Sequence, residues 1–109
     1  MTTQEVANMV AEIGLPYAYY EFPDDVEREL PFIAFLFTDN NDFIADNINY
    51  TDTRTLVIEL YTREKDFSLE QTVRSVLNGH EMPFLQESEY LNDERCWITT
   101  FTTEVVLNG

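Results

Sequence analysis

The most regular hydrophobic pattern of the chain lies between Arg54 and Leu77 and predicts a central strand followed by an amphipathic helix. In the strand, Leu56, Ile58 and Leu60 share one face, and β-branched or aromatic residues occupy most of the other face. A face made only of large aliphatic side chains needs cover from water. We therefore expect the following helix to pack against it.

That helix is predicted from a capping box and an apolar stripe. Ser68 stands at the expected N-cap with Gln71 three residues later, and Gly79 closes the helix. The stripe has the spacing i, i+4, i+7 and i+8 and consists of Leu69, Val73, Val76 and Leu77. It is expected to lie on the aliphatic face of the central strand.

The N-terminal segment predicts a first helix and a first strand. Thr2 and Glu5 form a second capping box, and Gly14 ends the helix. The apolar positions in between are Val6, Met9, Val10 and Ile13. Residues 17–22 are mostly aromatic and fit a pleated surface better than a helix. The chain is therefore expected to begin with a helix and a strand.

Three more strands are expected, although their patterns differ in strength. Residues 32–37 are apolar at both alternating sets of positions, so one face should meet the helices and the other a second layer or a partner subunit. Residues 43–48 match no pattern well and predict an extended loop or a ragged strand. A weaker strand is expected from Met82 to Tyr90, and a last strand from about residue 95 to 107.

These elements follow one another as α-β-β-β-α-β-β. The order predicts an α+β fold with an antiparallel sheet of four to five strands and two helices packed on one face. With 109 residues, 44% of them hydrophobic, the chain can build one core and is expected to form a single domain, 1–109.

Charge is the strongest signal in the composition. Six Lys and Arg residues stand against twenty-one Asp and Glu residues, which gives a net charge of −15. A surface of this sign repels a phosphate backbone. Three interpretations remain open: an ordinary soluble surface, a channel along which DNA slides without sticking, or an imitation of DNA that occupies a basic partner. The candidate residues for an acidic lumen are Asp24, Asp25, Asp39 and Asp42.

Catalytic chemistry has little support in the sequence. His80 follows a helix end and is interpreted as a polar loop residue, while Cys96 lies inside a predicted strand and is interpreted as a small buried hydrophobe. One cysteine and one histidine do not make a zinc site, and the aspartates lack the spacing of a calcium loop. We expect no catalytic residue, no metal and no cofactor. No stretch approaches the roughly 20 apolar residues of a membrane span, so we expect a cytosolic protein.

Three segments carry a resemblance to a known family: Leu15 to Phe22, Leu30 to Phe35, and Ile58 to Asp66. Their layout resembles that of the tail terminators or head-tail joining proteins of long-tailed bacterial viruses, and the element order matches over nearly the whole chain. The resemblance implies a non-enzymatic α+β subunit that forms a hexameric ring, caps the finished tail tube and docks to the head connector. It also implies a location in the host cytoplasm during assembly and then at the tail-head junction, where DNA passes without specific binding.

A ring subunit needs apolar surface for its neighbours, and fifteen aromatic residues in a chain of this length exceed the needs of one small core. The candidate interface residues are Tyr17, Tyr19, Tyr20, Phe32, Phe35, Phe37, Phe43 and Ile44. The alternative function is a small acidic inhibitor that mimics DNA. It ranks second because the carboxylates are scattered over loops and helix ends instead of forming regular rows.

Overall fold

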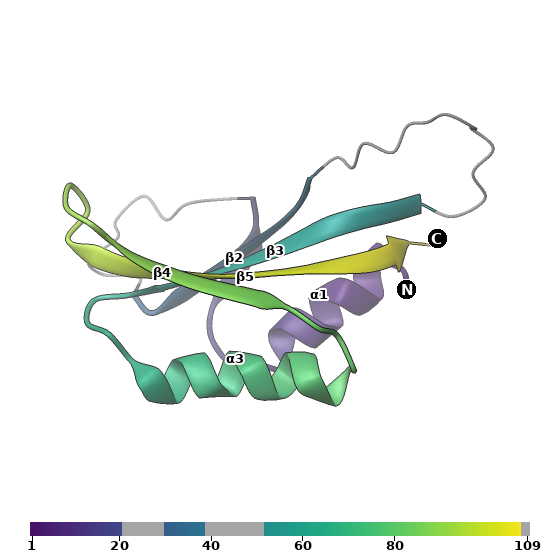
Figure 1. The fold of residues 1–109 in the computed structure, drawn as a ribbon, viewed down its shortest axis with the longest axis horizontal. Helices are drawn as coiled ribbons and strands as arrows, with labels where there is room; N and C mark the ends of the chain where they lie inside the picture. The colour runs from purple at the N-terminus through teal and green to yellow at the C-terminus, as the bar shows by residue number, and fades with distance from the viewer. Residues whose placement is uncertain (21–29, 39–51, 108–109) are drawn as a thin grey trace.

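The structure is a computed structural model that describes residues 1–20, 30–38 and 52–107. Within these residues, a five-stranded sheet carries two helices on one face (Figure 1). The elements are α1 (Thr3–Ala11), β1 (Tyr17–Tyr19), β2 (Phe32–Thr38), β3 (Asp52–Thr62), α3 (Phe67–Gly79), β4 (Leu85–Leu91) and β5 (Cys96–Leu107). The α+β class and the predicted order of elements are both confirmed.

The strand order in the sheet is β1-β2-β3-β5-β4, with β3 at the centre. β3 pairs antiparallel with β2 and β5, and β5 pairs antiparallel with β4. β1, however, runs parallel to β2, with Tyr17 opposite Ile33 and Tyr19 opposite Phe35. The prediction of a purely antiparallel sheet is therefore wrong. Twelve residues, 20–31, separate the two strands, and a connection of this length can return the chain to the same end of the sheet, which a hairpin turn cannot.

The predicted start of α1 is confirmed. The Thr2 hydroxyl accepts a hydrogen bond from the Glu5 N–H at 3.0 Å, and the Glu5 carboxylate accepts one from the Thr2 N–H at 2.8 Å. These two bonds satisfy donors that the first turn of a helix leaves without partners. Gly14 has a φ of +88°, a backbone conformation that glycine adopts without a steric penalty, and it turns the chain away from the helix toward β1.

The predicted start of α3 is wrong by two residues. The N-cap is Asp66, whose carboxylate accepts a hydrogen bond from the Leu69 N–H at 3.0 Å, and Ser68 lies inside the first turn. Gln71 donates to the Ser75 hydroxyl instead of closing a capping box. Aspartate caps a helix as well as serine does, and its negative charge also interacts favourably with the positive end of the helix dipole.

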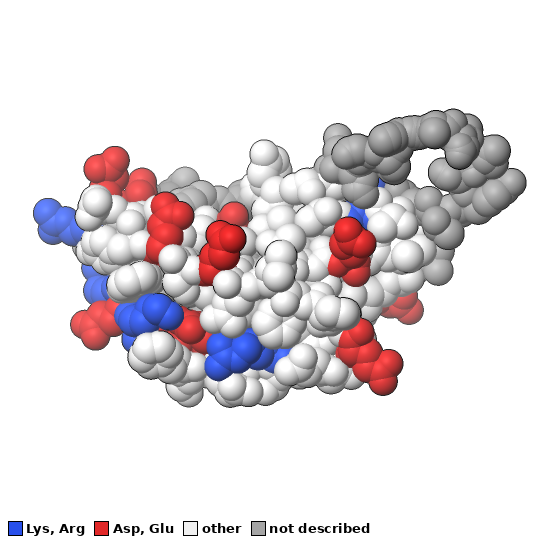
Figure 2. Space-filling view, viewed as in Figure 1, with Lys and Arg blue, Asp and Glu red and all other residues white. Residues whose placement is uncertain are grey.

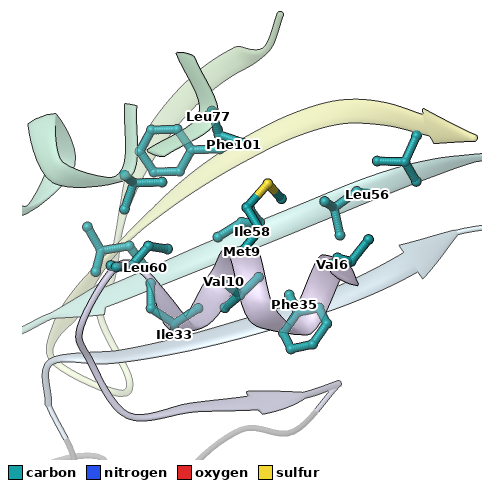
Figure 3. Close-up of a cluster of buried hydrophobic side chains, with 13 residues drawn as sticks. Val6, Met9, Val10, Ile33, Phe35, Leu56, Ile58, Leu60, Leu77 and Phe101 are labelled. Atoms are coloured by element: carbon teal, nitrogen blue, oxygen red, sulfur yellow. The ribbon is translucent and has the colours of Figure 1, made fainter. Parts of the chain in front are cut away.

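The main core lies between the helices and the sheet (Figure 3). Leu56, Ile58 and Leu60 of β3 are fully buried there, as the pattern of the central strand predicts. The helices and neighbouring strands complete the core with Val6, Met9, Val10, Ile13, Ile33, Phe35, Val73, Leu77, Phe101 and Val105. The core therefore joins both helices to the three central strands β2, β3 and β5.

A second, smaller cluster lies on the opposite face of the sheet and contains Phe32, Ala34, Tyr61 and Cys96. Because alternate residues of β2 belong to the two clusters, this strand is buried on both faces over its first four residues, as predicted. At the far edge, β4 begins at Leu85, three residues later than predicted. Met82 still donates its N–H to the Leu77 carbonyl at the end of α3, and Pro83 has no N–H for the sheet.

Candidate subunit interface

Three tyrosines gather at the edge of the sheet formed by β1. Tyr17, Tyr19 and Tyr20 expose 42%, 51% and 70% of their surface, although aromatic side chains of this size are usually mostly covered in a single domain. Together they are called the tyrosine edge below. Such side chains combine an apolar ring with a polar hydroxyl, a combination that is enriched where proteins meet.

The rings of the tyrosine edge rest on phenylalanines of β2. The Tyr19 ring centroid lies 5.4 Å from that of Phe35 and 5.9 Å from that of Phe37, and the Tyr17 centroid lies 6.3 Å from that of Phe35. Tyr20 contacts Tyr19 at 6.2 Å. These contacts hold the exposed rings in place, so a partner would have little side-chain freedom to remove on binding.

The backbone also directs Tyr20 outward. Its φ is +53°, in the left-handed region that bulky residues rarely adopt, and its N–H donates to the Phe35 carbonyl at 2.8 Å. Tyr20 is therefore anchored through its main chain while its ring projects beyond the strand.

Two of the predicted interface residues are not on the surface. Phe35 is 5% exposed and Phe32 is 8% exposed, because the main core covers one face of β2 and the second cluster covers the other. Phe37 is half-buried. The other two predicted interface residues, Phe43 and Ile44, lie outside the described residues, as do Asp24, Asp25, Asp39 and Asp42. Of the predicted interface, the structure therefore brings together the three tyrosines with Phe35 and Phe37.

The opposite edge of the sheet is formed by β4 and has a different surface. Its exposed side chains include Leu85, Glu87, Glu89 and Tyr90. Figure 2 shows red acidic side chains along the sheet, blue basic ones over the middle of α3, and further red ones near both ends of that helix. The two edges of one sheet thus differ in both charge and aromatic content.

The residues with potential for catalysis are held in structural contacts. The His80 Nε2 lies 3.1 Å from both carboxylate oxygens of Glu12, which joins the end of α3 to the end of α1. Cys96 is fully buried, as predicted, and its burial, followed by the Glu94 carboxylate, raises the pKa of the thiol. A thiol in this position is poorly suited to act as a nucleophile.

A buried carboxylate beneath α3 was missed from the sequence. Glu70 is 3% exposed, and its carboxylate accepts hydrogen bonds from the Lys65 ammonium, from the Gln86 amide at 3.3 Å and from the Thr99 hydroxyl at 3.4 Å. These bonds join α3 to β4 and β5. The spacing of Glu70 from Val73 and Leu77, i, i+3 and i+7, places it on the buried face and could have identified it.

Among the described residues, no group of three or more His, Cys, Asp or Glu side chains is arranged to hold a metal ion. In the same part of the chain, no helix is both long enough and apolar enough to cross a membrane. No known family model matches the chain, and no curated protein matches it at a significant level of similarity.

Proposed function

We propose that this protein is a structural subunit that assembles with its own copies into a ring, caps a phage tail tube and joins it to the head connector. The observation that carries the proposal is the tyrosine edge, three exposed aromatic residues on one border of the sheet. The resemblance of the element order to tail-completion proteins supplies the kind of assembly, including its six-fold symmetry and its partners.

Two physical features support assembly through this edge. First, a water-exposed cluster of aromatic rings gains free energy when a second protein surface covers it. Second, the Tyr17 and Tyr19 rings already rest on Phe35 and Phe37, so they present a fixed surface instead of one that must be ordered on contact. A closed ring repeats one such contact between each pair of neighbours and leaves no end for further growth.

The net charge fits the passage of DNA through such a ring. With fifteen more acidic than basic side chains, each subunit contributes a negative potential that opposes adsorption of a phosphate backbone. A conduit of this kind lets DNA move without being held.

The function is tested by adding the purified protein to tail tube protein during polymerisation and measuring tube lengths by electron microscopy. The wild-type protein is expected to stop tube growth. The variant Tyr20→Ser changes the most exposed ring of the tyrosine edge, and Tyr90→Ser, on the β4 edge, is the matched control. We expect Tyr20→Ser to lose the capping effect and Tyr90→Ser to keep it. Tubes that grow unchanged in the presence of the wild-type protein would contradict the proposal.

A further inference from the structure

The β4 edge offers a second binding surface, made of main-chain groups. β4 has seven residues and, among the described strands, is the last of the sheet and pairs with β5 on one side only. In an antiparallel pair, the N–H and C=O groups of every second residue point away from the partner strand. The outer side of β4 therefore carries main-chain donors and acceptors that an added strand could use.

The side chains of β4 divide between the two faces of the sheet. Leu91 belongs to the cluster on the face away from the helices, and by alternation Leu85, Glu87 and Glu89 lie on that same face. Across β5, Glu87 is opposite Thr100 and Glu89 is opposite Ile98, neither of which carries a charge. No ion pair of either glutamate is found among the described residues.

The opposite side of β4 is neutral, and basic side chains lie close to it. The Arg74 guanidinium donates to the side-chain amide oxygen of Gln86 at 3.1 Å, and the Tyr90 ring lies 5.5 Å from that of Trp97, centroid to centroid. Lys65 lies over the Trp97 ring at 5.7 Å. A strand added here would therefore meet the carboxylates of Glu87 and Glu89 on one face and mainly neutral side chains on the other, where the Lys65 ammonium is already paired with Glu70.

This charge pattern selects against a second copy of β4. If two β4 strands paired in register, in either direction, glutamates would face glutamates across the new contact. Like charges directly opposite one another destabilise a strand pair, whereas opposite charges stabilise it. In-register pairing of two β4 strands is thus disfavoured, and pairing with a strand of opposite charge is favoured.

We propose that the β4 edge binds an extended basic segment of a different protein as a sixth strand. Lysine or arginine residues at alternate positions of that segment lie opposite Glu87 and Glu89, and the residues between them, on the side of Tyr90, are neutral. The interaction uses the edge opposite to the tyrosine edge and does not depend on ring formation.

The test uses a synthetic peptide in which lysine and threonine alternate and leucine stands at each end. It is titrated into the full-length isotope-labelled protein and followed by amide chemical shifts. We expect the largest shift changes at residues 85–91 and an affinity that falls as salt is added. A peptide with glutamate in place of lysine should bind at least about tenfold more weakly, since two attractive pairs become repulsive.

Variants of the protein separate a local contact from a general effect of charge. Glu87→Lys/Glu89→Lys should reverse the preference between the two peptides. Glu64→Lys/Glu81→Lys has the same change in net charge at exposed positions outside β4 and should leave the preference unchanged. If the lysine variant does not fold, Glu87→Gln/Glu89→Gln replaces it. This variant only removes the two charges and should bind both peptides alike. An equal loss of preference in the Glu64 and Glu81 control, shifts centred outside β4, or no shifts at millimolar peptide would each overturn the proposal.

Discussion

The two edges of this sheet deal with the same physical problem in different ways. An edge strand leaves main-chain groups without partners and can pair with other chains unless it is short, charged or covered. β1 has only three residues and is surrounded by exposed tyrosine rings, whereas β4 has seven residues and carries two exposed glutamates near its centre. The surface of the β1 edge favours contact through side chains, and that of the β4 edge favours pairing with a positively charged strand.

The support beneath each edge differs in the same way. The tyrosine edge rests on Phe35 in the apolar core, while the β4 edge is tied to α3 by the hydrogen bonds of the buried Glu70 carboxylate. An apolar support resists change through packing, and a polar one through the cost of leaving buried groups without partners. Substitutions in the two supports should therefore have distinct effects.

The largest effect is expected beneath the tyrosine edge. Phe35→Ala should lower the free energy of unfolding by about 3–5 kcal/mol, because a large buried ring is removed from the core. Tyr20→Ala, whose ring is 70% exposed, should lower it by less than about 1 kcal/mol. Chemical denaturation measures both values. Similar losses for the two variants would show that Tyr20 belongs to the core and not to an interface.

A smaller effect is expected beneath β4. Glu70→Ala should lower the free energy of unfolding by about 1–3 kcal/mol, since Gln86 and Thr99 lose a buried hydrogen-bond partner. Glu87→Ala, on the exposed side of the same edge, should change it by no more than about 0.5 kcal/mol. If removal of Glu70 were as harmless as removal of Glu87, the network would not hold β4 in place.

The smallest effect concerns alkaline pH. Burial raises the pKa of the Tyr61 hydroxyl, which also donates to a Glu59 carboxylate oxygen at 2.9 Å, and burial likewise raises the pKa of the Cys96 thiol. Both groups are held uncharged in the folded state. Their contribution to stability is full below the ordinary pKa values of 9.0 for the thiol and 10.0 for the phenol, and it is lost as the pH rises above them.

The free energy of unfolding should therefore decline above about pH 9, and more gently in Tyr61→Phe than in the wild-type protein. Thermal unfolding at a series of alkaline pH values gives this slope. Tyr20→Phe is the matched control, since it removes the hydroxyl of an exposed ring, and it should leave the wild-type slope unchanged. Identical slopes for Tyr61→Phe and the wild-type protein would exclude the phenol as a cause.

The sequence predicts where the helices and strands lie along the chain better than it predicts which strands pair with each other in the sheet. Alternation along residues 54–61 and the stripe of α3 fix which faces are buried, because these patterns depend on local geometry alone. The parallel pairing of β1 depends on the path of the intervening chain, which no pattern records. Asp66 competes with Ser68 for the N-cap, and only the structure shows which side chain reaches the Leu69 N–H.

The same limit applies to the candidate interface. Apolar residues on both faces of a strand indicate burial on both sides, but the sequence does not tell whether a second cluster of the same chain or a partner provides it. Phe32 and Phe35 were therefore predicted at an interface, although β2 is an interior strand. The three tyrosines are exposed at the β1 edge, and their role at an interface stays a prediction.

The central claim is that the tyrosine edge drives self-assembly, and sedimentation velocity tests it most directly. The wild-type protein, the variant Tyr17→Ser/Tyr19→Ser/Tyr20→Ser and the variant Glu87→Gln/Glu89→Gln are compared at equal concentrations, with circular dichroism to establish that each is folded. We predict that the wild-type protein and the glutamate variant sediment as one discrete oligomer, and that the folded tyrosine variant sediments as a single chain. A wild-type protein that remains a single chain at high concentration, or a tyrosine variant that assembles like the wild-type protein, would contradict the claim.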